Sequence, residues 1–464
     1  MNYMKQKVYP AQSQRDLCGA WVISVNMGYG HQRTAYPLRN LARCLPKAGG
    51  WRGGWSPERK VINANDYQGI PNRDRKIWEG SRMFYESISR FSRIPLIGKA
   101  IFSIYDEFQK ILGFYPKREL SKPNFGLKQI YSLFKKGWGR DLIETLRRGS
   151  GQELLPLITT FFTPAFMAEF FNYPGEIFCV VCDADISRTW APLDPETSRI
   201  KYLASNNRVV ERLKLYGVKP ENIFLTGYPL PLENIGSEKM EILKEDSRHR
   251  ILNLDPQKKY FEKYKILIEE NLGKLPEKTD HPLTIMFSIG GAGAQKEIGI
   301  KIIKSLAVEI WAGRVKVILV AGIREKVKEY FLRHIKKLGL ENILGKNIEI
   351  IFAKNIEDYF QKFNLALRKI DILWTKPSEL SFYSVLGLPI IIAPPIGSQE
   401  EFNKRWLLKS GFGVSQENPR YTRQWLFDWL NRGYLAEVAM EGFIEGEKLG
   451  TAKIQKIISK CSGF

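Results

Sequence analysis

Short apolar runs alternate with amphipathic segments of helical length along most of this chain, and most of these runs lead into a polar or glycine-rich loop. Such alternation is typical of parallel sheets built from strand-helix-strand units. It predicts an α/β protein with two Rossmann-like domains. The predicted strands are residues 20–25, 177–181, 201–204 and 222–226 in the first domain, and 283–289, 315–321, 348–352, 370–375 and 389–393 in the second.

The length of the chain also favours two domains, because 464 residues exceed what one hydrophobic core normally holds. We expect an N-terminal domain at 1–235, with a helical aromatic and basic insertion at about 73–148. A charged, helix-rich connection at 236–281 leads to a C-terminal domain at 282–433. Residues 434–464 should supply a helix that returns to the first domain.

The clearest candidate site lies at 374–403. The strand ends at a polar loop, Lys376-Pro377-Ser378-Glu379, and a helical segment then runs to Gly387. A second strand leads into a loop that contains Gln399. Loops at the carboxyl ends of parallel strands line ligand crevices, so both polar loops should open onto one crevice.

Two glycine-rich turns join a strand to a helix. The first, NMGYGH at 26–31, precedes a predicted helix at 32–45, and the second, GGAGAQK at 290–296, precedes one at 298–311. Glycines and the amides of a helix start suit a phosphate or another polar ligand. Neither turn has P-loop or dinucleotide spacing, and the first also fits a tight turn with His31 merely exposed.

The formal net charge is +22, which attracts nucleic acid, an anionic membrane face or phosphorylated substrates without choosing among them. In 73–148, basic side chains alternate with apolar and aromatic ones. That pattern fits a membrane-bound face, and it also fits packed helices with solvated charges, which we favour.

Five cysteines are consistent with reduced thiols, and Cys179 and Cys182 lie in an apolar strand pattern that favours a structural role over metal binding. No apolar run is long enough to cross a membrane, and the N-terminus lacks the apolar region of a signal peptide. We therefore expect a cytoplasmic protein. Asp183 and Asp185 follow the strand at 177–181, where acids serve either chemistry or ion pairing.

In order along the chain, three motifs resemble those of GT-B glycosyltransferases: MGYGH, SIGGAGAQ, and TKPSELSFYSVLGLP followed by IGSQEEFN. The branch that looks most similar holds monogalactosyldiacylglycerol synthase and the peptidoglycan N-acetylglucosaminyltransferase. The resemblance covers 21–41 and 202–414. It implies two domains facing across a cleft, a nucleotide-sugar donor with UDP favoured, a lipid or glycan acceptor, and no metal or cofactor.

The resemblance also implies roles for individual residues. Those expected at the donor are Gly291, Gly293 and Gln295 for the diphosphate, Ile356 for the base, Lys376, Ser378 and Glu379 for the sugar diphosphate, and Gln399 and Asn403 for the transferred sugar. Gly28, Gly30 and His31 would face the acceptor. His31, or alternatively Asp183 or Asp185, would act as general base on the acceptor hydroxyl.

One position departs from the pattern of these enzymes. Their ribose-binding glutamate falls on Phe382, which cannot accept a hydrogen bond from a hydroxyl. Glu379, three residues earlier, is the nearest carboxylate that could replace it.

Three hypotheses follow. The first is a glycosyltransferase, and the second is a nucleotide-sugar 2-epimerase on the same fold. The third is a non-catalytic protein that binds a membrane surface or another polyanion, with nucleic acid the less expected partner.

Overall fold

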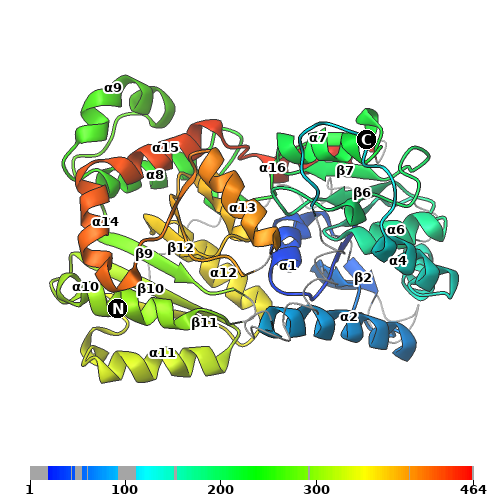
Figure 1. Ribbon diagram of the computed structural model, residues 1–464, viewed down its shortest axis with the longest axis horizontal. Coiled ribbons are helices and arrows are strands. Elements are labelled where there is room, and N and C mark those ends of the chain that lie inside the picture. The colour runs from blue at the N-terminus through cyan, green and yellow to red at the C-terminus, as the bar shows by residue number, and fades with distance from the viewer. Residues whose placement is uncertain are drawn as a thin grey trace.

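The computed structural model describes residues 19–42, 44–46, 55–59, 61–91, 111–150, 154–290, 293–396 and 398–461. They form two lobes side by side, each built on a parallel six-stranded sheet (Figure 1). The predicted α/β architecture with two Rossmann-like domains is therefore confirmed.

The N-terminal sheet has the order β4-β1-β5-β6-β7-β8. Its strands are β1 (Trp21–Ser24), β4 (Ile62–Asn63), β5 (Leu157–Thr159), β6 (Ile177–Val180), β7 (Lys201–Ala204) and β8 (Ile223–Leu225). The covering helices include α1 (Gly30–Ala35), α6 (Phe162–Phe170) and α7 (Asn207–Leu215). The sequence pattern did not predict β4 or β5, because runs of two or three residues are too short to show alternation.

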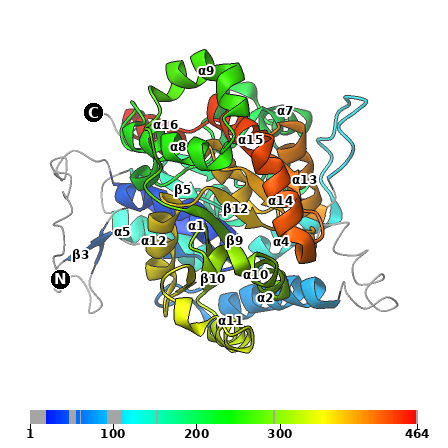
Figure 2. The ribbon, with the colours of Figure 1, turned by 90° about the vertical axis from the view of Figure 1, so that its left-hand side faces the viewer.

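The C-terminal sheet has the order β11-β10-β9-β12-β13-β14. Its strands are β9 (Leu283–Ser288), β10 (Val315–Gly322), β11 (Ile348–Phe352), β12 (Ile372–Thr375), β13 (Ile390–Ile392) and β14 (Gly413–Ser415). Around it lie α10 (Lys296–Trp311), α11 (Glu325–Lys337), α12 (Ile356–Leu367), α13 (Ser398–Lys409) and α14 (Thr422–Asn431). In Figure 2 this lobe faces the viewer, with α11 below the sheet.

Two predicted helices have a different form. The run at 32–45 is only a short α1 followed by the 3-10 helix η1 (Tyr36–Leu41), because Pro37 has no amide hydrogen to continue the α-helical ladder. The segment after the loop at 376–379 is also a 3-10 helix, η6 (Glu379–Leu386). It ends at Gly387, whose φ of 64° is left-handed. Other short 3-10 helices are η2 (Arg188–Trp190), η3 (Pro220–Asn222), η4 (Leu232–Asn234), η5 (Glu341–Ile343) and η7 (Pro419–Tyr421).

The described part of the aromatic and basic insertion is helical. It comprises α2 (Asn72–Phe91), α4 (Phe125–Lys135) and α5 (Arg140–Ser150). Phe134, Trp138 and Leu142 are buried in the core, so these helices pack as folded structure. The side chains of residues 82 and 84–91 and all of 92–110 lie outside the described residues. Of the small hairpin β2 (Cys44–Pro46) and β3 (Trp55–Arg59), the backbone alone is described.

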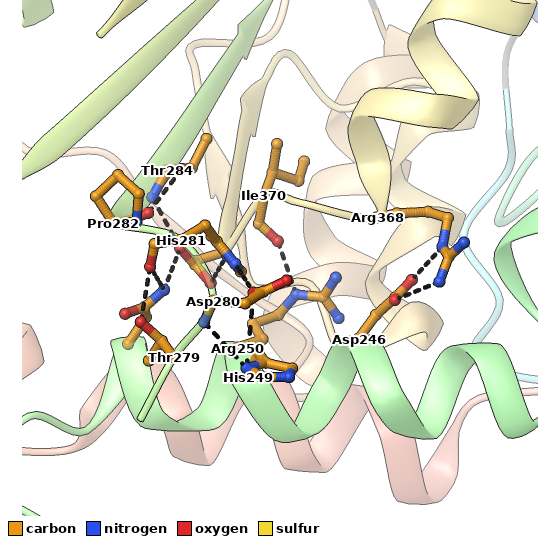
Figure 3. Close-up of polar contacts among 12 residues, drawn as sticks. Asp246, His249, Arg250, Thr279, Asp280, His281, Pro282, Thr284, Arg368 and Ile370 are labelled. Carbon is orange, nitrogen blue, oxygen red and sulfur yellow. Dashed lines mark hydrogen bonds and ion pairs between the residues drawn. The ribbon is translucent and has the colours of Figure 1, made fainter. Parts of the chain in front are cut away.

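The charged connection forms α8 (Glu241–Leu254) and α9 (Lys259–Leu272), which lie on the C-terminal lobe (Figure 2). Arg250 of α8 is buried and donates to the carbonyl oxygens of Ile370, at 2.9 Å, and Leu386, at 2.7 Å. Figure 3 shows this region, where α8 meets the loop before β9. The connection is thus part of the C-terminal lobe.

His281 lies in that loop between two carboxylates. Its Nδ1 is 2.5 Å from Asp280 Oδ1, and its Nε2 is 3.2 Å from Oδ1 of the fully buried Asp371 (Figure 3). Burial alone would lower the pKa of His281, but Asp371 and Asp280 outweigh it and raise that pKa.

The chain returns to the N-terminal lobe through α15 (Tyr434–Glu445) and α16 (Gly450–Cys461), drawn in red in Figure 1. Ile454 and Ile458 of α16 join a core cluster with Val22 and Leu38. Among the residues that the structure describes, no helix is long and apolar enough to span a membrane.

Candidate active site between the two lobes

The candidate site lies where the carboxyl ends of the two sheets meet. From the N-terminal domain come His31 at the start of α1 and Asp183 after β6. From the C-terminal domain come Glu379 at the start of η6, and Gln399 and Asn403 on α13. The structure thus brings together predicted site residues from both domains. The contacts of each side chain determine its charge and its possible chemical role.

An ion pair joins the two domains beside this site. Arg33 Nε of α1 lies 3.3 Å from Glu379 Oε1, and both side chains are largely buried. Arg33 Nη2 also donates to the Tyr359 hydroxyl at 2.8 Å, and its guanidinium lies 4.3 Å from the ring centroid of Phe363. Although burial opposes its charge, these neighbours raise the pKa of Arg33, which stays cationic.

Glycines in the first loop allow this close approach. A Cβ atom at position 30 would lie 3.3 Å from Glu379 Oε2, closer than most side chains tolerate. Gly28 has a φ of 102°, which favours glycine over any other residue. Of the two glycines predicted to face an acceptor, Gly30 therefore also sets how closely the loop approaches Glu379, whereas Gly28 allows the turn of the backbone.

His31 is an uncharged residue at this site. Its Nδ1 lies 2.8 Å from the carbonyl oxygen of Thr160 and 3.3 Å from Cys182 Sγ. Burial lowers the pKa of His31 to about 4, so the ring is neutral at pH 7. A hydrogen on Nδ1 satisfies the Thr160 carbonyl and leaves Nε2 as an acceptor.

Asp183 has the properties of an acid-base group. Burial raises the pKa of this carboxyl to about 7, although hydrogen bonds from Asn403 and Gln399 oppose the shift, and the charge of Glu379 adds to it. A general base works best when its pKa lies near the working pH. Asp183 meets that condition at a point where both domains contribute contacts.

Asp185, the other acid after β6, is held in an ion-pair network. Arg212 donates to both of its carboxylate oxygens at 2.8 Å, and Arg208 Nε donates at 3.0 Å. Its side chain is only 4% exposed. These contacts give Asp185 a structural role in fixing the loop, which leaves His31 and Asp183 as the candidates for the base.

Gln399 and Asn403 reach across the crevice to the same loop. Gln399 Nε2 donates to the carbonyl oxygen of Asp185 at 2.7 Å, and Asn403 Oδ1 accepts from the amide of Ala184 at 3.0 Å. The two residues predicted to hold the transferred sugar therefore also hold Asp183 in place.

Two of the remaining predicted donor residues, Gln295 and Lys376, lie near the start of α10. Gln295, in the left-handed conformation with φ 64°, precedes this helix and donates to the carbonyl oxygen of Pro394 at 2.8 Å. The side chain of Lys376 lies against the Cα side of Gly290, where a Cβ atom would collide with it, and forms an ion pair with Glu400.

Three other predicted donor residues are at loop and helix ends. Gly293 has a φ of 72°. Ser378 caps η6, and Ile356 is the first residue of α12. Gly291, predicted at the diphosphate, lies outside the described residues.

The sequence pattern missed several residues at this crevice. The hydroxyl of Tyr29 accepts from the amide of Ile323 at 3.3 Å, and its ring lies 5.1 Å from that of Tyr359. Arg33 was missed as well. The tyrosine of MGYGH was visible between two glycines, but only the folded chain shows that it contacts the opposite domain.

A small polar cavity of about 150 Å³ opens at the carboxyl ends of β1 and β4, and is lined by Asn26, Asn65, Asp66, Arg75, Trp78 and Glu79. The Asn26 amide donates to Asn65 Oδ1 at 2.9 Å, which fixes one wall. The cavity offers amide, carboxylate and guanidinium groups beside an indole ring, a combination that suits a polar ligand on the N-terminal side.

Phe382, at the position of the expected glutamate, is buried in a cluster of aromatic rings. Its ring stacks on Tyr228 of the N-terminal domain with centroids 4.8 Å apart, and the ring of Trp406, from the same domain as Phe382, lies 4.9 Å from it. This position therefore serves domain packing, whereas Glu379 is the carboxylate at the crevice.

The family described as Domain of unknown function (DUF6938) matches residues 276–346. No curated protein matches the chain in sequence.

The similar solved structures include UDP-GlcNAc 2-epimerase from Neisseria meningitidis bound to UDP-GlcNAc, with 14% identity, a TM-score of 0.41, and coverage of 78% of this chain and 88% of that one. They also include MurG from Acinetobacter baumannii, at 13% identity and a TM-score of 0.42, covering 73% of this chain and 80% of that one.

Proposed function

We propose that this protein is a glycosyltransferase that moves a sugar from a nucleotide diphosphate to a hydroxyl group, without a metal ion. The observation that carries the proposal is Asp183. It is a carboxyl with a pKa of about 7, placed between two Rossmann-like domains and held by Gln399 and Asn403 of the opposite domain. The resemblance of the loop motifs supports UDP as the first donor nucleotide to test.

In the proposed reaction the acceptor oxygen attacks the anomeric carbon of the donor sugar. The bond from that carbon to the diphosphate oxygen breaks, and the electron pair leaves with the diphosphate. The hydroxyl proton passes to the Asp183 carboxylate. No oxidation or reduction occurs, so the chain needs only to position two substrates and stabilise charge.

The C-terminal domain supplies groups suited to the leaving diphosphate. Gln295 and Gly293 precede the amino end of α10, where helix amides favour an anion. Lys376 adds a cation beside the same loop. Preorganised donors of this kind stabilise charge that develops in the transition state.

The N-terminal domain would hold the acceptor. Neutral His31 offers Nε2 as a hydrogen-bond acceptor, which orients an acceptor hydroxyl. The cavity beside Asn26 and Asn65 offers polar groups for the rest of a glycan or a lipid headgroup. The net charge of +22 supports peripheral contact with an anionic membrane, which co-sedimentation with anionic and neutral vesicles would test.

The experiment that tests the glycosyltransferase proposal is a binding and turnover panel of UDP-, GDP- and dTDP-sugars. We expect one nucleotide to raise the melting temperature and Gln295→Ala to reduce that rise. Lys301→Ala, on the half-buried face of α10, serves as the matched control. If none of the nucleotides stabilises the protein, the proposal fails.

A second candidate is a nucleotide-sugar 2-epimerase. It is favoured by two carboxylates in one crevice, with the charge of Glu379 raising the pKa of Asp183, because epimerisation removes a proton from one face of a carbon and returns it to the other. An epimerase would convert the donor without any acceptor, so chromatography of donor incubated with the protein alone separates the two reactions.

A further inference from the structure

A second cavity, of about 430 Å³, lies beside the segments that connect the two domains. Its walls include Asn207 at the start of α7, Tyr228, Phe382, Trp406, Lys409 and Glu445. It is therefore shared between the domains. Asn403 and Lys409 are on the same helix, α13, and the helical rise places the far end of α13 on the order of 15 Å from the Gln399 end.

Aromatic rings form one side of this hinge cavity. Tyr228 and Phe382 are stacked directly on one another, which leaves no room for a ligand between them. Trp406 is tilted by 45° to Phe382, so these two rings do not form a parallel slot for a flat ligand either. Within the described chain, Trp406 Nε1 has no hydrogen-bond partner, although the indole ring is only half-exposed. Because Tyr228 and Phe382 are almost fully buried, the accessible part of the aromatic side is the Trp406 indole with its one available donor.

The opposite side carries charges of both signs. Glu441 and Glu445 extend from α15 and are exposed, while Glu447 is paired with Lys453. Lys409 and Asn207 add hydrogen-bond donors. The hinge cavity therefore combines several acceptors and several donors with an aromatic face.

This lining discriminates among ligand classes. Among the described residues that line the cavity, Glu441 and Glu445 face a single unshared cation, Lys409, because the other lining cation, Arg208, is paired with Asp185; this balance of charge disfavours a nucleotide or another phosphate. Charged and amide groups disfavour a lipid chain, because they would lose their hydration without gaining a hydrogen bond. A neutral polyol satisfies both sides: its hydroxyls donate to carboxylates and accept from Lys409, and its C–H face packs on an indole.

We propose that the hinge cavity binds a saccharide at a second site that adjoins the reaction crevice, since Ser205 and Asn206 in its wall donate to the carbonyl oxygens of Asp183 and Ala184. Because its walls come from both domains, a bound saccharide favours the arrangement in which they touch. Coupling between two sites is reciprocal, so saccharide and donor should raise each other's affinity. That coupling rests on the proposed glycosyltransferase function, whereas saccharide binding itself does not.

The test is titration of the full chain with neutral mono- and disaccharides, followed by calorimetry and ligand-observed NMR. We expect binding that Glu445→Gln and Trp406→Ala each weaken at least tenfold. Glu329→Gln on α11 and Trp311→Ala on α10, both exposed and far from the cavity, should leave it unchanged. Glu445 is exposed, so its variant should fold normally even if Trp406→Ala does not.

Three outcomes would overturn the proposal. The first is that no neutral saccharide binds at millimolar concentration. The second is that saccharide binds but Glu445→Gln leaves its affinity intact. The third is that Asp183→Asn, in the reaction crevice, abolishes saccharide binding, which would place the sugar there. Failure of every nucleotide to bind, with saccharide binding intact, would reject only the glycosyltransferase proposal.

Discussion

Phe382 and Tyr228 stack with ring centroids 4.8 Å apart and planes 7° apart, and they belong to different domains. Both are almost fully buried. The position at which the resembling enzymes carry a glutamate is therefore occupied by an interdomain contact. The phenylalanine in place of the glutamate thus contributes to the contact between the domains, while Glu379 supplies a carboxylate at the crevice.

Replacing Phe382 by glutamate should destabilise the protein. The new carboxylate would be buried against the ring of Tyr228, and burying a charge there should cost about 3–5 kcal/mol. Phe382→Leu keeps the site apolar and should cost about 1 kcal/mol. Urea unfolding of both variants measures the difference. Equal stability, together with tighter donor binding by Phe382→Glu, would show that the position faces the donor after all.

Asp183→Asn should lower turnover by about 10²–10⁴-fold, because an amide cannot take up the acceptor proton. Donor affinity should hardly change. In the unaltered protein the pKa of Asp183 is raised to about 7, so the active carboxylate is lost as the pH falls below that value. The rate should therefore rise with pH up to about 7 and then level. A rate independent of pH between 5 and 8 would argue against Asp183 as the base.

Asp185→Asn should behave differently from Asp183→Asn. It leaves Arg212, whose side chain is fully buried, without its full partner, which costs about 3–5 kcal/mol of folding free energy. Chemical unfolding monitored by circular dichroism measures this loss. A stable Asp185→Asn variant with strongly reduced turnover would instead return Asp185 to the list of candidate bases.

Arg33→Met should loosen the contact between the two domains, since it removes the ion pair to Glu379 and the hydrogen bond to Tyr359. We expect a larger radius of gyration in small-angle X-ray scattering and weaker donor binding. Arg33→Lys should rescue little, because a lysine lacks the planar fork that makes both contacts. Arg39→Met, which removes a cation stacked on Tyr36, serves as the control. An unchanged radius would mean that other contacts hold the domains together.

His281 should make stability depend on pH. Asp280 and Asp371 face it, and His249 and Lys369 act on the charge of Asp280 (Figure 3). Because the folded-state pKa of His281 is raised, its contribution is complete below the unfolded-state pKa near 6.5 and is lost as the pH rises through the folded-state value.

The measurement is the unfolding free energy of His281→Gln from pH 5 to 9. We expect a smaller decline above pH 6.5 than in the unaltered protein. His334→Gln on α11, where the ring contacts a carbonyl oxygen and no carboxylate, should retain the full decline. Identical curves for all three proteins would rule out this role for His281.

Much of the fold could be predicted because the hydrophobic periodicity of each segment agrees with the glycine, proline and polar residues that bound it. The long strand β10 and helix α10 begin and end within a few residues of their expected limits. β5 could not be predicted, since a three-residue strand next to Pro156 carries no period of its own. Its place between β1 and β6 is fixed by pairing with distant residues.

The candidate site was predictable in location more than in function. Loops at strand ends indicated His31, Asp183 and Glu379, because parallel strands bring their carboxyl ends to one edge. The sequence could not distinguish Asp183 from Asp185. The difference depends on Arg212, which lies on the next helix and pairs with only one of them.

The return of α16 to the N-terminal lobe has a consequence for biosynthesis. Thr451 donates to the carbonyl oxygen of Leu230, a residue 221 positions earlier, and Ile454 and Ile458 complete a core cluster around Val22. On the ribosome, the lobe that is made first therefore stays unfinished until the other lobe has emerged. The apolar surface that α16 will cover stays exposed to solvent during that interval, so we expect the nascent chain to bind chaperones.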